Sequence, residues 1–455
     1  MVLVVMAAGL GIGLWVWKQV RSVRPTNLIL ITVDTLRADH LGAYGYRRAT
    51  SPNVDALAKE SLLFRRAFSQ APETNPSLSS LMTSHYVHET QVRRNFHQLQ
   101  PGANTLAEIL QANGWRTGAV VSNYSLRRGS GFEQGFEDYD DRMEDVATPT
   151  WEGIERVAPK TTAAALDWLR RHREDRFFLW VHYMDPHAPY HPLEPYNAMF
   201  LESAGGERKH LPFLSLESFE AGSQVGGIPV NARLGDHADP EYYVSQYDGE
   251  ISFLDHWLGE LLKETRALGL LDNTLVILTA DHGEGMGEHN LYFNHTEFVY
   301  TELIHVPLLI RLPGASQAGK AIELPVGLID LLPTILRALA LESPGPLRGQ
   351  NLLNPQPKAI LAGAFFTPGQ VTVISGEMKL IHTAGRYSLY DLGRDFYEAR
   401  DLMQTGDVAE LDAARGLKET MFAIRNQDEL GLGLPVEWVV LPEEKRKLKA
   451  LGYVQ

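Results

Sequence analysis

Apolar residues follow two spacings along this chain. Some form uninterrupted runs rich in β-branched residues, which are expected to be strands buried on both faces. These runs are Asn27–Val33, Thr117–Ser122, Phe177–His182, Leu275–Thr279 and Val306–Arg311. Others recur at helical spacing, in Ser51–Ser61, Thr105–Asn113, Thr162–His172, Pro240–Leu268 and Leu328–Leu341. Strands that alternate with amphipathic helices predict an α/β fold, with a mostly parallel central sheet between helices.

Two regions depart from this alternation. Gly205–Asp239 is rich in Gly, Ser, Pro and His and is expected to be a long surface insertion that faces the substrate. Toward the C-terminus the predicted elements become shorter, with strands at Gly369–Ser375 and Met378–His382 and a closing helix at Asp407–Asn426. We therefore expect a large catalytic domain over residues 25–350 and a small C-terminal α+β subdomain over residues 351–455.

An uncharged apolar run precedes the first strand. Val2–Trp17 is slightly short of the ~20 residues that cross a bilayer, and it ends in Trp residues of the kind found at membrane interfaces. A buried helix and a signal peptide are the alternatives, but the run has no polar face, no positive segment before it and no small-residue cleavage site. We expect residues 1–24 to be an uncleaved membrane anchor. Lys18, Arg21 and Arg24 follow the run and favour a cytoplasmic body by the positive-inside rule.

Composition narrows the chemistry. The chain contains no Cys, which excludes disulfides, Cys-ligated zinc, iron–sulfur clusters and a Cys nucleophile. Any metal site must therefore use oxygen and nitrogen ligands. The formal net charge is -14, so we expect no nucleic-acid partner, because such a partner calls for a basic face.

Candidate metal ligands stand directly after two predicted strands. Asp34 follows Asn27–Val33, and Asp281 and His282 come just after Leu275–Thr279. Proteins with parallel sheets bind small molecules and ions beyond the carboxyl ends of the strands. These three side chains are therefore expected to meet there. An Asp in such a place can also be a helix cap or a turn residue. Together the three side chains predict one divalent ion, with Mn²⁺ or Zn²⁺ favoured and Ca²⁺ as an alternative.

Hydroxyl and imidazole groups are the candidate reactive residues. Thr74 lies where a proline-broken loop enters a predicted helix, either as a cap or, beside a metal, as a nucleophile. His residues gather in two short loops, where they can hydrogen-bond an anion or protonate a leaving group; they are His187, His191, His289 and His295. Asp185, His191 and His295 are also ligand types for a second ion, although we expect a single ion.

Several segments, in this order, resemble the sulfatase family of the alkaline-phosphatase superfamily. They include NLILITVDTLRADHLGAYGY, APETNPSLSSLMTSHYVHE, FFLWVHYMDPHAPY, TADHGEGMGEH and NHTEFVYTELIHVPLLIRLPG. The resemblance runs from about Thr26 to the C-terminus and implies an alkaline-phosphatase-like sandwich with a divalent metal at the strand ends. It implies metal ligands at Asp34, Asp281 and His282, a nucleophile at Thr74, and catalytic, substrate-binding imidazoles at His187 and His295.

The sequence departs from the sulfatase pattern at the nucleophile. The family's C/S-x-P-S-R motif, whose first residue becomes formylglycine, reads T-N-P-S-L over Thr74–Leu78. Thr cannot become formylglycine, so no formylglycine is expected. The stretch that corresponds to the family's Lys contains Asn123, which we include among the predicted substrate-binding residues. Of the family's paired Asp residues only Asp34 remains, and the set resembles single-metal phosphotransferases with a Thr nucleophile.

These features predict a metal-dependent hydrolase of sulfuric or phosphoric esters, with chemistry that leans to phosphoesters. A Thr ester cannot collapse to an aldehyde, so water or an acceptor alcohol must complete the reaction at the metal. A membrane-anchored phosphotransferase is the first alternative, and an inactive anion-binding relative is the second. The family's usual location favours a periplasmic body tethered to the inner membrane, against the orientation that the basic residues favour.

Overall fold

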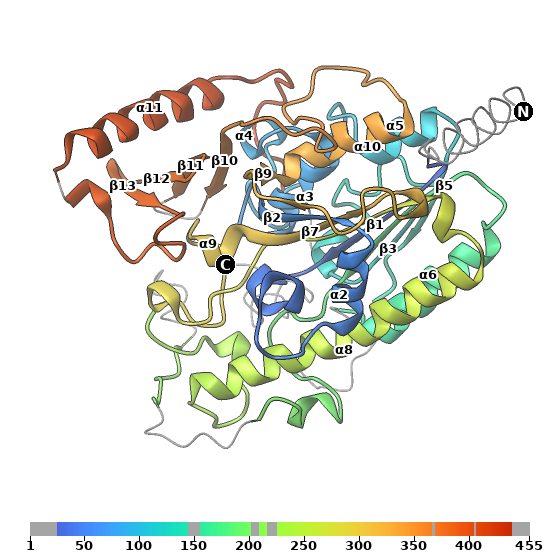
Figure 1. The fold of residues 1–455 in the computed structure, drawn as a ribbon, viewed down its shortest axis with the longest axis horizontal. Helices are drawn as coiled ribbons and strands as arrows, with labels where there is room; N and C mark the ends of the chain where they lie inside the picture. Colours follow the sequence, from blue (N-terminus) through green and yellow to red (C-terminus); the bar gives the residue numbers. More distant parts are fainter. Residues whose placement is uncertain are drawn as a thin grey trace, which may run out of the picture.

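A nine-stranded mixed sheet forms the centre of the large domain (Figure 1). The computed structural model describes residues 25–143, 155–201, 209–215, 225–365, 369–404 and 406–438. The strand order is β4-β3-β5-β1-β6-β7-β2-β8, with β9 beside β2. The strands are β1 (Asn27–Val33), β2 (Leu62–Phe68), β3 (Arg116–Val121), β4 (Asp138–Asp140), β5 (Phe177–Tyr183), β6 (Thr274–Ala280), β7 (His305–Arg311), β8 (Ala321–Ile322) and β9 (Val326–Gly327).

β1 occupies the middle of the parallel part of this sheet. It pairs in parallel with β5 on one side and with β6 on the other, and all three strands are buried along their length. In the register, Val33 lies opposite Tyr183 and Ala280, so the three strands end at one edge of the sheet. Asp34 and Asp281, the next residues after two of these strands, therefore start from adjacent points at that edge.

Helices cover both faces of the sheet (Figure 1). One layer contains α3 (Thr74–Thr83), α5 (Leu106–Ala112) and α10 (Leu331–Leu339), and the opposite layer contains α2 (Pro52–Lys59), α6 (Ala158–Arg171) and α8 (Pro240–Ala267). Two short helices, α4 (Val87–Thr90) and α9 (Thr301–Ile304), lie in connections. Apolar side chains of both layers and of the sheet form one continuous core. The predicted fold class, a mostly parallel sheet between helices, is confirmed.

A separate antiparallel sheet stands at the C-terminal end of the chain. Its order is β10 (Ile360–Ala364), β11 (Gln370–Ser375), β12 (Met378–Thr383) and β13 (Arg386–Asp391). α11 (Val408–Arg425) packs across it, with Ala414, Leu417 and Met421 against apolar residues of the strands. This is the predicted α+β subdomain architecture, and the other face of its sheet packs against residues of the large domain such as Leu303 and Ile304.

The sequence and the structure differ at the far edge of the central sheet. Val306–Arg311 predicts another parallel strand, but β7 runs antiparallel to β6. An apolar run reports burial and carries no information on strand direction. β2 is not predicted at all, because Arg65 and Arg66 interrupt its apolar residues. The register of β2 against β7 shifts between Phe64 and Ala67, which accommodates these charged residues.

Two other predictions fall partly or wholly outside the described residues. Of Gly205–Asp239, residues 209–215 and 225–239 are described, and they contain one 3₁₀ turn, Val230–Ala232, and isolated bridges. The predicted anchor at residues 1–24 lies outside the described residues. None of the described helices combines the length and the apolar character that a membrane crossing requires.

The contact between α6 and β3 predicts the effect of one added methyl group. A Cβ atom at Gly118 would lie 2.3 Å from the indole ring of Trp168, so Gly118→Ala is expected to lower the free energy of unfolding by about 1–3 kcal/mol. Gly416→Ala in α11 is the matched control, because nothing lies within 4 Å of that position and Ala favours a helix. Urea unfolding followed by circular dichroism measures both; equal stabilities would contradict the described packing.

Candidate active site and metal centre

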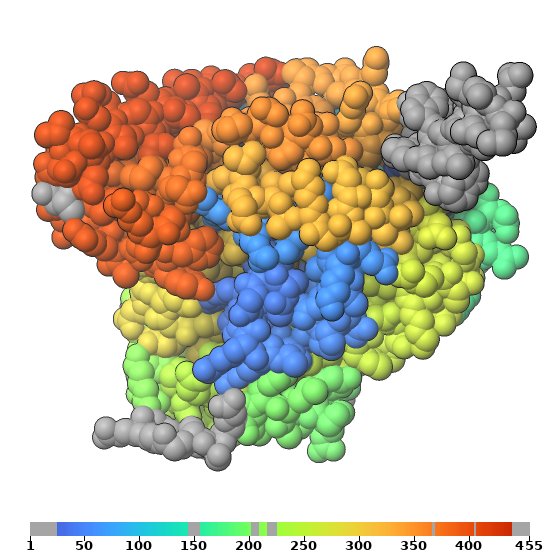
Figure 2. All heavy atoms as spheres, in the orientation of Figure 1, coloured from blue at the N-terminus to red at the C-terminus, as the bar shows by residue number. Residues whose placement is uncertain are grey.

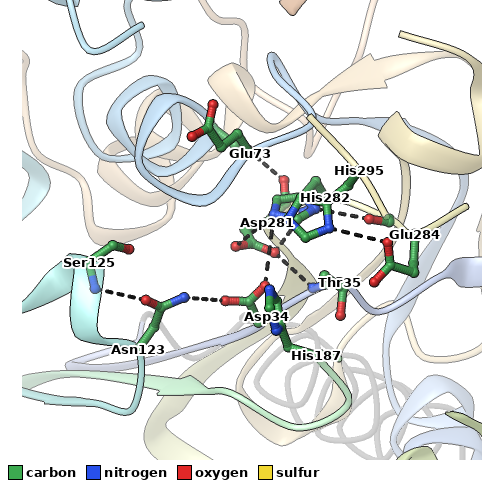
Figure 3. Close-up of polar contacts among 12 residues, drawn as sticks. Asp34, Thr35, Glu73, Asn123, Ser125, His187, Asp281, His282, Glu284 and His295 are labelled. Atoms are coloured by element: carbon green, nitrogen blue, oxygen red, sulfur yellow. Dashed lines mark hydrogen bonds and ion pairs between the residues drawn. The ribbon is translucent and has the colours of Figure 1, made fainter. Parts of the chain in front are cut away.

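Asp34, Asp281 and His282 converge at the carboxyl edge of the sheet (Figure 3). Their candidate ligand atoms lie within 4.8 Å of one another, and all three side chains are buried. His282 Nε2 lies 3.8 Å from Asp34 Oδ1 and 3.6 Å from Asp281 Oδ2. None of these three atoms has a hydrogen-bond partner among the described residues. Buried polar atoms are normally paired, so three unpaired atoms that face one another fit a bound cation.

The other polar atoms of these side chains are held by hydrogen bonds. Asp281 Oδ1 accepts from the backbone N–H groups of Thr35 at 3.2 Å and of His282 at 2.7 Å. His282 Nδ1 lies 2.9 Å from the carbonyl oxygen of Gly283. A carbonyl oxygen can only accept, so Nδ1 carries the proton and Nε2 presents its lone pair to the two carboxylates. The backbone thus orients these two ligands before any ion binds.

Two carboxylates this close in a dry site cannot both be charged without compensation. Burial opposes ionisation of Asp34, but His187, His182 and His282 around it hold its pKa below the usual range. Burial, and then the charge of Asp34, raise the pKa of Asp281 well above its ordinary value. Burial lowers the pKa of His282 to about 3, so the ring is neutral at pH 7. A divalent cation would relieve the conflict, and a neutral imidazole is the form that binds metal.

Thr74 stands at the same cluster. It is the first residue of α3, and its side chain lies close enough to the Asp281 carboxyl to oppose the effect of burial, which raises the pKa of that group. The N-cap position belongs to Glu73, so Thr74 does not serve as the cap. Ser77 is held elsewhere, because its hydroxyl donates to the backbone oxygen of Asp281 at 2.6 Å. The structure therefore brings the predicted nucleophile to the predicted ligands.

Asn123 holds Asp34 from the side opposite His282 (Figure 3). Its Nδ2 donates to Asp34 Oδ2 at 2.6 Å, and its Oδ1 accepts from the N–H of Ser125 at 2.8 Å. Ser125 Oγ in turn donates to Asn75 Oδ1 at 2.8 Å, which ties this chain of amides to α3. Asn123 thus orients a candidate metal ligand, and its contact with a substrate stays a prediction.

Two imidazoles line the site beside the ligands. The His295 ring centroid lies 4.5 Å from that of His282 and 5.3 Å from that of His187. His187 Nδ1 lies 2.7 Å from the carbonyl oxygen of Ala188, and His295 Nδ1 lies 3.2 Å from Glu284 Oε1. Burial lowers the pKa of His187, and it lowers that of His295 to about 4. Both rings are therefore neutral at pH 7.

The chain matches the family model Sulfatase over residues 26–341, a range that includes every residue of this cluster. The chain belongs to the sulfatase family. Members of this family are metal-dependent, and membership indicates an ester hydrolase. The three unpaired ligand atoms at the strand ends agree with that metal dependence.

Similar proteins cover both sulfate and phosphonate ester chemistry by name. The ulvan-active sulfatase of Formosa agariphila is 28% identical over an aligned length of 358 residues, and the match covers 73% of this chain and 66% of that protein. The multifunctional alkaline phosphatase superfamily protein PehA of Trinickia caryophylli is 27% identical over an aligned length of 399 residues, and the match covers 72% of this chain and 76% of that protein. The crystal structure of a phosphonate monoester hydrolase of Agrobacterium radiobacter superposes with a TM-score of 0.71 at 23% identity, and it covers 92% of this chain and 100% of that one.

This member of the sulfatase family differs from the family's motif at two positively charged positions. Leu78, at the position of the motif's Arg, is fully buried in the hydrophobic core. Asn123, in the stretch of the family's Lys, is an uncharged amide committed to Asp34. Neither position therefore offers a positive charge to an anionic substrate.

Two residues that the sequence analysis does not single out also belong to the site. His182 lies inside the apolar run of β5, and its Nε2 is 3.5 Å from Asp34 Oδ2. Its Nδ1 lies 2.9 Å from Thr32 Oγ1. Glu284 is fully buried, faces His295, and accepts from the Tyr190 hydroxyl at 3.1 Å. The local signal for His182 was a polar residue within a buried strand. The local signal for Glu284 was an acidic residue just after the ligand pair Asp281 and His282.

The other histidines and acids of the sequence analysis lie apart from this cluster. Among the described residues, neither of the two groups that could hold a metal contains Asp185 or His191, so the set considered for a second ion is not assembled. Burial raises the pKa of Asp185 to about 6. His289 contacts the loop after β13, where its Nε2 lies 3.0 Å from the carbonyl oxygen of Tyr397.

The buried carboxyl of Glu73 predicts a pH-dependent contribution to stability. Burial raises its pKa to about 8, above the value of an unfolded chain, so the folded protein keeps a proton that the unfolded chain releases. This contribution is complete in acid and is lost as the pH rises through about 8. Glu73→Gln removes it while keeping an acceptor for the N–H of Asn95.

The stability of Glu73→Gln relative to the parent protein should therefore rise by roughly 1 kcal/mol per pH unit between about pH 5 and pH 8. Urea unfolding at several pH values measures this difference. Glu419→Gln, the same change at an exposed position of α11, is the control. A constant difference for Glu73→Gln would mean that the carboxyl is ionised in the folded protein.

Proposed function

We propose that this sulfatase-family protein hydrolyses sulfuric or phosphoric esters with Thr74 as its nucleophile, and that phosphoric esters are the better substrates. The observation that supports this most directly is the position of the Thr74 side chain at the Asp281 carboxyl, whose pKa it lowers, beside three buried ligand atoms without partners. Asp34, Asp281 and His282 would hold one divalent ion through those atoms. Mn²⁺ or Zn²⁺ is favoured by the mixed carboxylate and imidazole donors, and Ca²⁺ is the alternative.

The choice of ester class follows from the nucleophile. The ion supplies Lewis acidity, which favours the ionised form of a nearby hydroxyl and withdraws charge from an ester oxygen. Thr74 Oγ1 forms a bond to phosphorus or sulfur while the bond to the leaving alcohol breaks. The resulting Thr ester carries only one oxygen on Cβ. It therefore cannot release its phosphate or sulfate group by collapsing to an aldehyde. Water must therefore attack the same centre in a second in-line displacement, which suits phosphoryl transfer well.

His187 and His295 would serve the substrate anion and the leaving group. Burial keeps both rings neutral in the free protein, but the negative charge of a bound ester raises the pKa of a neighbouring imidazole. A protonated ring can then donate its proton to the departing alkoxide. Glu284 faces His295 and would stabilise the imidazolium form, and burial raises its own pKa to about 7. Because Leu78 stands in the core at the position of the family's Arg, these groups would neutralise the negative charge of the substrate instead.

Removing the Thr74 hydroxyl tests its role directly. Thr74→Ala is expected to lower kcat by roughly 1000-fold or more while metal content stays unchanged, because the ligands are Asp34, Asp281 and His282. Thr74→Ser should keep part of the activity, since it keeps the hydroxyl. Thr83→Ala is the matched control: the same change at the other end of α3, where the hydroxyl donates to the backbone oxygen of Ser79. Unchanged turnover by Thr74→Ala would rule out the assignment.

A parallel assay separates the ester classes and separates hydrolysis from transfer. An aryl sulfate, a phosphate monoester, a phosphate diester and a phosphonate monoester are each supplied with Mn²⁺, Zn²⁺ or Ca²⁺. We expect the highest kcat/KM for a phosphoric ester, with product formed in water alone. Product that forms only after addition of an alcohol such as glycerol would instead indicate a phosphotransferase. Metal-loaded protein that turns over none of the four would indicate an inactive anion-binding relative.

A further inference from the structure

A second group of buried ionisable side chains lies where the C-terminal sheet meets the large domain. Glu302 of α9 is 3% exposed, and Glu398, in the loop after β13, is 2% exposed. Together with His289, in the 3₁₀ turn Glu288–Asn290, they offer ligand atoms within 4.8 Å of one another. Figure 2 shows the segment that contains this turn (yellow) beside the C-terminal subdomain (orange and red). The group therefore joins segments that are distant in sequence.

The carboxylate of Glu302 has no hydrogen-bond partner on either oxygen among the described residues. A buried carboxylate without donors is unfavourable, so it needs a proton or a cation. A protonated carboxyl would in turn need an acceptor for its O–H, and neither oxygen makes such a bond. The arrangement therefore leaves room for a cation where a hydrogen bond would otherwise be expected.

His289 is set up as a neutral ligand. Its backbone has a φ of 50°, a left-handed conformation, and its ring stacks on Tyr300 with centroids 3.5 Å apart. Nε2 lies 3.0 Å from the carbonyl oxygen of Tyr397, which can only accept, so Nε2 carries the proton. Nδ1 then carries the lone pair, and burial lowers the pKa of the ring, which keeps that lone pair available.

The contacts that orient Glu398 leave a lone pair on each of its carboxylate oxygens available. Oε2 accepts from the N–H of Thr301 at 2.7 Å, and Oε1 lies 2.6 Å from Lys379 Nζ. Each carboxylate oxygen has a second lone pair that can bind an ion. Lys379 is held in place by the carbonyl oxygen of Val299 at 2.7 Å. One lysine thus balances one of the two glutamates.

The wider cluster contains more carboxyl groups than cationic groups. Arg37 pairs with Asp39 at 2.7 Å and with Glu288 at 2.8 Å. Burial raises the pKa of Glu302 to about 8, and the neighbouring charge of Glu288 adds to this rise. Four carboxyl groups, on Asp39, Glu288, Glu302 and Glu398, therefore face two cationic groups, on Arg37 and Lys379. A divalent ion would balance this interior.

We propose that Glu302, Glu398 and His289 form a second metal site, which binds a divalent transition-metal ion such as Zn²⁺ or Mn²⁺. An imidazole nitrogen beside two carboxylates is the donor set of these ions, whereas Ca²⁺ takes six to eight oxygens. The site is distinct from the Asp34 cluster and shares no ligand with it.

The second ion would position the catalytic ligands. The backbone of α9 lies directly against Gly283, the residue after His282: Gly283 donates to the oxygen of Leu303 at 2.8 Å. A Cβ atom at position 283 would lie 2.0 Å from the oxygen of Glu302, so only Gly allows this approach. An ion on Glu302 and Glu398 would clamp the C-terminal subdomain to the helix that supports His282.

The test measures metal content in full-length protein that carries Asp34→Asn and Asp281→Asn, which disable the first site. After dialysis against EDTA, this protein is titrated with Zn²⁺ or with Mn²⁺, and bound metal is counted by mass spectrometry. We expect one equivalent, together with a rise of a few degrees in Tm. Adding Glu302→Gln to this protein should abolish both the bound metal equivalent and the rise in Tm. Adding His289→Gln, at a partly exposed position, should do the same if Glu302→Gln fails to fold.

The control is Glu89→Gln, which changes another fully buried glutamate, paired with Arg348 at 2.6 Å, and should keep the metal. Absence of bound metal in the double-Asn protein would overturn the proposal. Equal metal content with and without Glu302→Gln would also overturn it, and would identify Glu302 as a protonated carboxyl. Neither result bears on Thr74, so the second site and the proposed reaction can fail independently.

Discussion

Charge compensation at the carboxyl edge of β1 and β6 is the constraint on which the rest of the structure depends. Parallel pairing brings Asp34 and Asp281 together in a fully buried place, where two negative charges are unfavourable. The surrounding groups each reduce that cost: Asn123 and His182 on Asp34, and the N–H groups of Thr35 and His282 on Asp281. The remaining lone pairs face one another, and a cation is the group that would satisfy all of them.

The local part of this arrangement follows from the sequence. Asp34, Asp281 and His282 were predictable because buried parallel strands are visible as apolar runs and ligands gather after their ends. The pairing of β1 with both β5 and β6 makes those ends neighbours, as expected. Thr74 was predictable as a candidate only, because a hydroxyl at the start of a helix can equally be a cap, and its position beside Asp281 depends on how α3 packs.

Other parts of the site depend on contacts that no local pattern reports. His182 lies in a strand whose residues are all buried, and only its distance from Asp34 reveals a role. The direction of β7 and the existence of β2 depend on pairing across the sheet, not on composition. Glu302 and Glu398 lie nearly a hundred residues apart, in a helix of one turn and in a loop, so their meeting could not be anticipated from spacing.

The central position of β1 also has a consequence for how the protein is made. β1 is complete by residue 33, but its partners β5 and β6 begin at residues 177 and 274. During synthesis, a chain that has reached β5 still presents one edge of β1 unpaired, with apolar residues on both faces. Such an edge can pair with another chain until β6 emerges. Long-range parallel pairing also slows folding, so the order of synthesis leaves a prolonged aggregation-prone intermediate that chaperones would need to shield.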